Sequence, residues 1–253
     1  MEPTIKISQP TIDFGQVDLG DKRLNERLLQ FVETITKNAK GSIMSSAKGR
    51  NEAKAYYRML SNEKLDIEQL QGISSGAALS RMSGTVLLIQ DTMDVNLNGH
   101  KKTEGLGYCS EHVLGVKVHS CIGLSPSGIP YGLVSQSYDT RIEAKSKLTQ
   151  AKKNARRIEE KESWRWLETL RDSTSIIPDG VHFITICDRE GDIYELYAEA
   201  QSLETDFIIR VTHDRRTDTD EKTITKIREM KALGTVTVNI PRNSRKSVSA
   251  RNT

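Results

Sequence analysis

The spacing of apolar residues divides the chain into a helical first part and a second part in which strands alternate with helices. Near the N-terminus, apolar residues recur at the spacing of one helix face, namely at Leu24, Leu28, Phe31, Val32 and Ile35. Either Asp18 or Asp21 can cap the start of this helix. Two more helices are expected over 51–60 and 66–79. We therefore predict a small all-helical domain at residues 1–78.

From Thr85 onward the pattern is typical of strands. The apolar run from Thr85 to Gln90 predicts a buried strand that ends at Asp91. A Pro/Gly turn separates two further extended segments and predicts an antiparallel hairpin. The expected elements after Thr85 are strands at 116–122 and 129–134, a long polar helix at 141–157, an apolar helical stripe up to Arg171, a strand at 182–187, a helix at 193–200, a strand at 207–211, a helix at 224–230 and a strand at 235–238. This order predicts an α/β fold with a mixed sheet in a domain at residues 79–253.

The composition excludes several classes of protein. The longest apolar run without a charge, Val86–Ile89, is far shorter than the roughly 20 residues of a membrane helix, and residues 1–10 lack the apolar core of a signal peptide. The chain has three cysteines without Cys-x-x-Cys spacing, which argues against a disulfide framework and a structural zinc site. We expect a cytoplasmic protein with no membrane partner.

The net charge of +3 conceals two basic stretches. Between Asp21 and Arg58 there are nine basic residues and four acidic ones, and between Arg141 and Arg157 there are seven basic residues and one acidic residue. Each stretch can be an ordinary solvated helix face or a surface that follows a phosphate backbone.

Two strands that are far apart in the sequence are each followed by an aspartate, Asp91 and Asp188. If these strands are parallel neighbours, both carboxylates lie at one sheet edge. Paired carboxylates suit Mg²⁺ or Mn²⁺, although strands also often end in an Asp that caps a turn. Glu195, Glu199 and Glu229 lie on expected amphipathic helices, so we predict that they are solvated.

Several runs resemble the DDE transposases of bacterial insertion sequences, and more closely the cut-and-paste branch that forms hairpin ends. The runs in the second domain are Asp-Arg-Glu-Gly-Asp-Ile-Tyr from Asp188, Asp-Thr from Asp91, Val-His-Ser from Val118 and Ser-Gly-Ile-Pro-Tyr-Gly-Leu from Ser127. The N-terminal runs from Phe14 to Leu24 and from Glu52 to Leu60 are similar to that family's small helical domain, which binds transposon ends.

The resemblance implies a ribonuclease H-like core in which Asp91 and Asp188 are the first two metal-binding, catalytic carboxylates. It also implies that Arg210 contacts DNA near the cleavage site. In the helical domain we expect Lys48, Arg50, Lys54 and Arg58 to bind DNA phosphates. The third family carboxylate, a Glu within a Tyr-x-x-Arg-x-x-x-Glu context, is absent from the sequence, so we expect a core that is incomplete at its C-terminus.

Two functions follow from these features. The first is a transposase, or an N-terminal part of one, that binds transposon-end DNA and depends on Mg²⁺ or Mn²⁺, located in the cytoplasm with the nucleoid. The second is a non-catalytic DNA-binding remnant or an inhibitor of a full-length transposase. The sequence leaves open whether the chain pairs with itself or with a full-length transposase. For His119, we favour a hydrogen-bonded structural role over a catalytic one.

Overall fold

The computed structural model describes residues 10–100, 102–142, 149, 152, 155–237, 239–240 and 251–252. The chain forms two compact units, residues 1–210 and residues 211–253, which are described separately. The expected boundary between residues 78 and 79 stays a prediction, and this position falls within a helix of the first unit.

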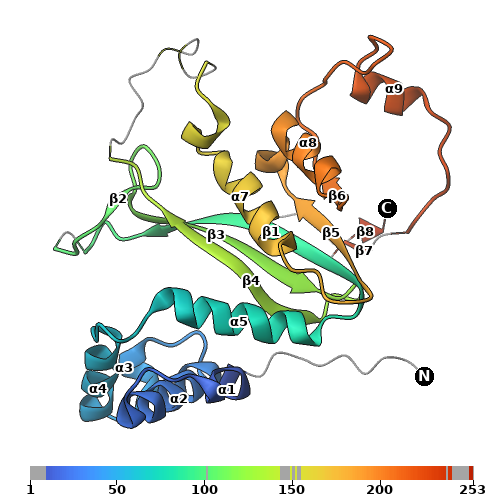
Figure 1. Ribbon diagram of the computed structural model, residues 1–253. Coiled ribbons are helices and arrows are strands. Elements are labelled where there is room, and N and C mark those ends of the chain that lie inside the picture. The colour runs from blue at the N-terminus through green and yellow to red at the C-terminus, as the bar shows by residue number, and fades with distance from the viewer. Residues whose placement is uncertain are drawn as a thin grey trace. The chain divides into compact units, whose positions relative to one another are not determined.

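The first unit combines a group of helices with a mixed sheet (Figure 1). Its helices are α1 (Pro10–Asp13), η1 (Phe14–Gln16), α2 (Lys22–Lys37), α3 (Ile43–Ser46), α4 (Arg50–Leu60), α5 (Ile67–Arg81), η2 (Ile158–Glu160), α7 (Trp164–Thr174), η3 (Arg189–Gly191) and α8 (Tyr194–Ser202). Its strands are β1 (Gly84–Asn96), β2 (Gly107–Tyr108), β3 (Leu114–Leu124), β4 (Pro130–Asp139), β5 (Val181–Cys187) and β6 (Asp206–Ile209). The expected N-terminal helices, the hairpin and the mixed α/β sheet are thus confirmed.

A capped loop explains the polar run that precedes α2. Asp21 is the N-cap of α2, and its carboxylate accepts hydrogen bonds from the backbone N–H groups of Arg23 and Leu24. Asp18 instead accepts from the backbone of Gly20, whose φ of +69° is readily adopted by glycine. Apolar residues of this loop and of the helices α2 and α4 pack together in one core cluster, which consists of Val17, Leu19, Leu24, Leu28 and Met59.

The sheet has the strand order β2-β3-β1-β5-β6, and β4 also pairs with β3. β1 is antiparallel to β3, whereas β1, β5 and β6 are parallel to one another. The prediction that the first strand ends at Asp91 is wrong, because β1 continues to Asn96. The extension forms because residues 91–96 go on pairing with β3, as far as the Asn96–Gly115 pair.

A partly buried ion pair connects the helices to the sheet. The guanidinium of Arg81, at the end of α5, donates to the carboxylate of Asp13 and to the backbone oxygen of Tyr131 in β4. The shared core continues this junction, since Ala78 and Met82 pack with buried residues of β1, β3, β4 and β5. Helix α5 therefore joins the N-terminal helices to the strands.

The second unit contains α9 (Thr223–Glu229) and a short antiparallel pair, β7 (Asn239–Ile240) with β8 (Arg251–Asn252). The prediction of a strand at 235–238 is wrong for residues 235–237, which have no regular structure, and Val236 is exposed. Residue 238 lies outside the described residues. The helix predicted at 141–157 also falls largely outside them. In the described parts of the chain, no helix is both long and apolar enough to cross a membrane.

Candidate functional site

One side of α4 carries a row of basic side chains. Ala53, Tyr56 and Met59 are buried, which fixes the orientation of the helix. The predicted phosphate-binding residues Arg50, Lys54 and Arg58 are exposed on α4 and follow one another at four-residue steps, so they share a face. Lys48 is also exposed and precedes the helix; its backbone N–H donates to Glu52 and helps to start α4.

The four cations lack the ion pairs that some other basic residues form. Arg81 is paired with Asp13, and Arg171 with Glu199, whose hydrogen bond raises the pKa of Arg171. Lys48, Arg50, Lys54 and Arg58 form no ion pair with any residue that the structure describes. An external anion can therefore bind these side chains without first breaking an ion pair within the protein.

The predicted carboxylates belong to two neighbouring parallel strands: Asp91 lies within β1, and Asp188 directly follows β5. The pairing of these strands ends at Ile89 and Ile186, and the same register, continued by two residues, would set Asp91 opposite Asp188. Both side chains are exposed, and Figure 1 shows the two strands side by side. The condition set out from the sequence, that the two strands are parallel neighbours, is met. The metal-binding role of the carboxylates stays a prediction.

Asp188 also caps a tight turn, as the alternative interpretation predicted. Its carboxylate accepts from the backbone N–H of Glu190 at 2.8 Å and starts η3. The turn folds back closely on β5, because a Cβ on Gly191 would lie 2.5 Å from the Cβ of Cys187. Asp192 is buried and accepts from the hydroxyl of Tyr197 at 2.8 Å. The glycine and the second aspartate of the run are thus structural.

Arg210 directly follows β6 and is exposed. Cys187 pairs with Ile209, and the backbone N–H of Arg210 donates to the backbone oxygen of Cys187 at 3.2 Å. The register therefore sets Arg210 opposite Asp188. Asp188 and Arg210 are thus the first residues after β5 and β6, and Asp91 lies within β1, the parallel strand next to β5.

A buried polar group lies beneath this edge of the sheet. His119 of β3 is 1% exposed and contacts Trp166 of α7 edge-on, with ring centroids 4.5 Å apart. Burial, together with the charge of Arg165, lowers the pKa of His119 to about 4. The ring bonds to Gln90 and Thr92, which confirms the prediction of a hydrogen-bonded histidine. The only signal in the sequence for these partners is that Gln90 and Thr92 are two residues apart, so their side chains lie on the same face of a strand.

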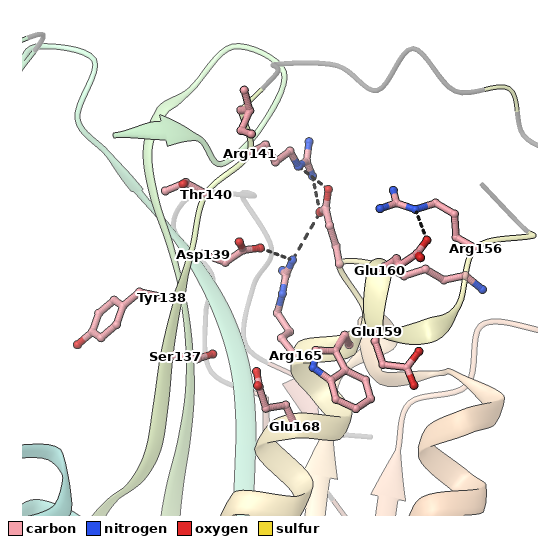
Figure 2. A pocket seen from close by; sticks show the side chains of 14 residues that line it. Ser137, Tyr138, Asp139, Thr140, Arg141, Arg156, Glu159, Glu160, Arg165 and Glu168 are labelled. Carbon is pink, nitrogen blue, oxygen red and sulfur yellow. Dashed lines mark hydrogen bonds and ion pairs between the residues drawn. The ribbon is translucent and has the colours of Figure 1, made fainter. Parts of the chain in front are cut away.

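A cavity of about 580 Å³ lies where the end of β4 meets η2 and the start of α7 (Figure 2). Acidic and basic side chains are nearly equal in number among its lining residues, which include Asp139, Glu159, Glu160, Glu162, Glu168, Arg141, Arg156, Lys161 and Arg165. Arg165 forms ion pairs with Asp139 and Glu162, and Figure 2 shows Arg165 beside Asp139. Because these charges compensate one another, the cavity does not favour a polyanion such as DNA.

The donor chemistry of the Asp91–Asp188 pair fits a divalent metal ion. Carboxylate oxygens are the ligands that Mg²⁺ and Mn²⁺ prefer, and Mg²⁺ commonly binds through one or two carboxylates and retains several waters. Among the described residues, no group of three or more His, Cys, Asp or Glu side chains could hold a metal ion. The pair would therefore supply two protein ligands to such an ion.

Comparison with protein families supports a role for the N-terminal helices. A family model described as transposase DNA-binding matches residues 11–65. The matched segment contains the capped loop, α2 and the whole of α4 with its row of cations. Its description supports a transposase-like protein with DNA as its partner, and it covers the four basic residues that the sequence predicts to bind phosphates.

Proposed function

We propose that the chain is a DDE-type transposase that resembles the hairpin-forming branch of insertion-sequence enzymes. The N-terminal helices bind transposon-end DNA through Lys48, Arg50, Lys54 and Arg58. The sheet forms a ribonuclease H-like core in which Asp91 and Asp188 bind Mg²⁺ or Mn²⁺. Support comes from the family match at residues 11–65 and from the strand order of the sheet.

The observation that carries the DNA-binding part is the row of exposed cations on α4. One side of α4 is buried against the other N-terminal helices, and its exposed side carries Arg50, Lys54 and Arg58. Phosphate contacts of this kind supply affinity and orientation without reading the base sequence. The row therefore holds the DNA backbone, and other contacts determine which ends are chosen.

The catalytic part of the proposal rests on the sheet edge. Asp91 and Asp188 would hold the divalent ion, and Arg210 would bind a phosphate close to them. A divalent ion held by Asp91 and Asp188 would supply a water molecule of lowered pKa and would neutralise charge at a phosphodiester. The residues of the chain position the DNA and orient the two carboxylates toward it.

A second candidate is a non-catalytic DNA-binding protein or an inhibitor of a full-length transposase. The observation in its favour is that Asp91 and Asp188 have no third metal-ligating side chain beside them among the described residues. Such a protein would bind the same DNA through the same face of α4 and would not cleave it.

The experiment is the binding of the full chain to a short fluorescein-labelled duplex, followed by anisotropy. Replacing Arg50, Lys54 and Arg58 together by Gln keeps good helix formers on α4 and removes three charges. We expect the affinity to fall by at least about tenfold. The control is Lys64→Gln, since Lys64 is an exposed cation of the matched segment outside α4.

The control measures the effect of removing one exposed cation that lies outside α4. If α4 is the interface, the Lys64→Gln protein binds within about twofold of wild type. Equal affinities of the triple variant and wild type would refute the DNA-binding role of this face.

A further inference from the structure

Asp91 lies between two residues that are bound to the same side chain. Gln90 and Thr92 point to the opposite face of β1 from Asp91, because side chains alternate along a strand. The hydroxyl of Thr92 lies 2.7 Å from Nδ1 of His119, and Nε2 of His119 lies 3.2 Å from Oε1 of Gln90. One imidazole therefore bonds to both neighbours of Asp91.

The directions of these bonds follow from the chemistry of the groups. The amide oxygen of Gln90 can only accept, so Nε2 of His119 carries the proton, and Nδ1 accepts from the hydroxyl of Thr92. The ring itself is held between β3, on which it lies, and Trp166 of α7. A rigid side chain thus fixes the side-chain directions of Gln90 and Thr92.

Thr92 transmits this constraint to the carboxylate. Its backbone N–H donates to Oδ1 of Asp91 at 2.8 Å, while its hydroxyl is bound by His119. Because the hydroxyl and the backbone N–H belong to one residue, a shift of the β1 backbone at Thr92 would disturb both bonds. The orientation of the Asp91 carboxylate is therefore coupled to His119 through a single residue.

Stability alone does not explain this arrangement. Nε2 of Gln90 is buried and has no hydrogen-bond partner among the described residues, and a buried donor without a partner costs about 1–3 kcal/mol. Apolar residues at positions 90 and 119 would avoid that cost. Polar groups retained in a core against their cost are expected near functional sites.

We propose that His119 is a positioning residue that orients the Asp91 carboxylate through Thr92. This inference rests on the proposed function, in which Asp91 is a ligand of a divalent ion. Partners outside the ligand shell typically change metal affinity by about 10–100-fold when they are removed.

The test measures Mn²⁺ binding to the full chain from the electron paramagnetic resonance signal of free Mn²⁺. Thr92→Val removes the hydroxyl and keeps the shape and the backbone N–H, so the dissociation constant should rise by about tenfold. Thr92→Ser restores the hydroxyl and should return to within about twofold of wild type. The matched control is Thr185→Val, because the hydroxyl of Thr185 is buried on β5 without a hydrogen-bond partner in the described chain.

The Asp91→Asn variant tests the metal site separately from the positioning role of His119. If Asp91→Asn leaves Mn²⁺ binding unchanged, the metal site of the proposed function is refuted, and the inference with it. If Asp91→Asn weakens binding while Thr92→Val and Thr185→Val both match wild type, the metal site holds and the positioning role of His119 is overturned.

A second measurement needs neither metal nor substitution of Thr92. In His119→Gln, hydrogen exchange at the Thr92 amide should be at least about tenfold faster than in wild type, because its bond to Asp91 is no longer held. The amide of Leu88, in the buried part of β1, serves as the internal reference for global unfolding. Unchanged protection at Thr92 would also overturn the proposal.

Discussion

At the scale of single residues, burial decides how His119 responds to pH. The pKa of this side chain is about 4 in the folded chain against 6.5 for an ordinary histidine. Between these values the unfolded chain binds more protons than the folded chain. Acidification from pH 6.5 toward 4 therefore favours unfolding, and the contribution of His119 becomes constant below about pH 4.

We predict that the free energy of unfolding of wild type falls more steeply over this window than that of His119→Gln. The difference should amount to roughly 3 kcal/mol at most, from about 1.4 kcal/mol per pKa unit. Urea unfolding at several pH values measures it. Parallel pH dependences of the two proteins would contradict the burial of a neutral imidazole.

Residues whose roles depend on local sequence could be predicted, and those whose roles depend on long-range contacts could not. The capping role of Asp21 follows from its position before an amphipathic run. The bonds between His119 and the neighbours of Asp91 arise from the register of β1 with β3, which no local pattern specifies.

At the scale of elements, the turn after β5 requires a glycine at position 191, because there is no room for a Cβ. Gly191→Ala would bring a Cβ to 2.5 Å from the Cβ of Cys187 and to 3.4 Å from the ring of Trp166. Both neighbours are buried, so the turn itself has to move. We expect this substitution to destabilise the protein by about 1–3 kcal/mol in urea unfolding.

Gly72→Ala provides a control of opposite sign. Gly72 is exposed within α5, and a Cβ there meets no atom within 4 Å. Alanine is favoured over glycine inside a helix, so this variant should gain up to about 1 kcal/mol. A Gly191→Ala protein as stable as wild type would show that the turn does not pack against β5 as described.

The types of most elements could be predicted because their apolar periods are clear, as in α4 and the hairpin of β3 with β4. The extension of β1 beyond Asp91 could not, because residues 91–96 contain only two apolar residues, Met93 and Val95, and their pairing with β3 keeps them in the sheet. The apolar residues around Val236 suggested a strand, but 235–237 have no strand partner among the described residues.

At the scale of the whole molecule, the distribution of charge matters more than the net value of +3. Basic residues such as Arg81, Arg165 and Arg171 are paired with carboxylates around the core, whereas the α4 row is exposed and unpaired within the described chain. Through α5 and the Arg81–Asp13 pair, that row belongs to the same compact unit as the sheet edge with Asp91 and Asp188. DNA held by α4 would thus be bound to the unit that carries the carboxylates.

The salt dependence of DNA binding tests the central claim most directly. For duplex DNA, the logarithm of the binding constant falls with the logarithm of the salt concentration by about 0.9 per phosphate contact. If Arg50, Lys54 and Arg58 each contact a phosphate, their joint replacement by Gln should make the slope shallower by about 3, and Lys64→Gln should leave it unchanged. Identical slopes for wild type and the triple variant would contradict the account.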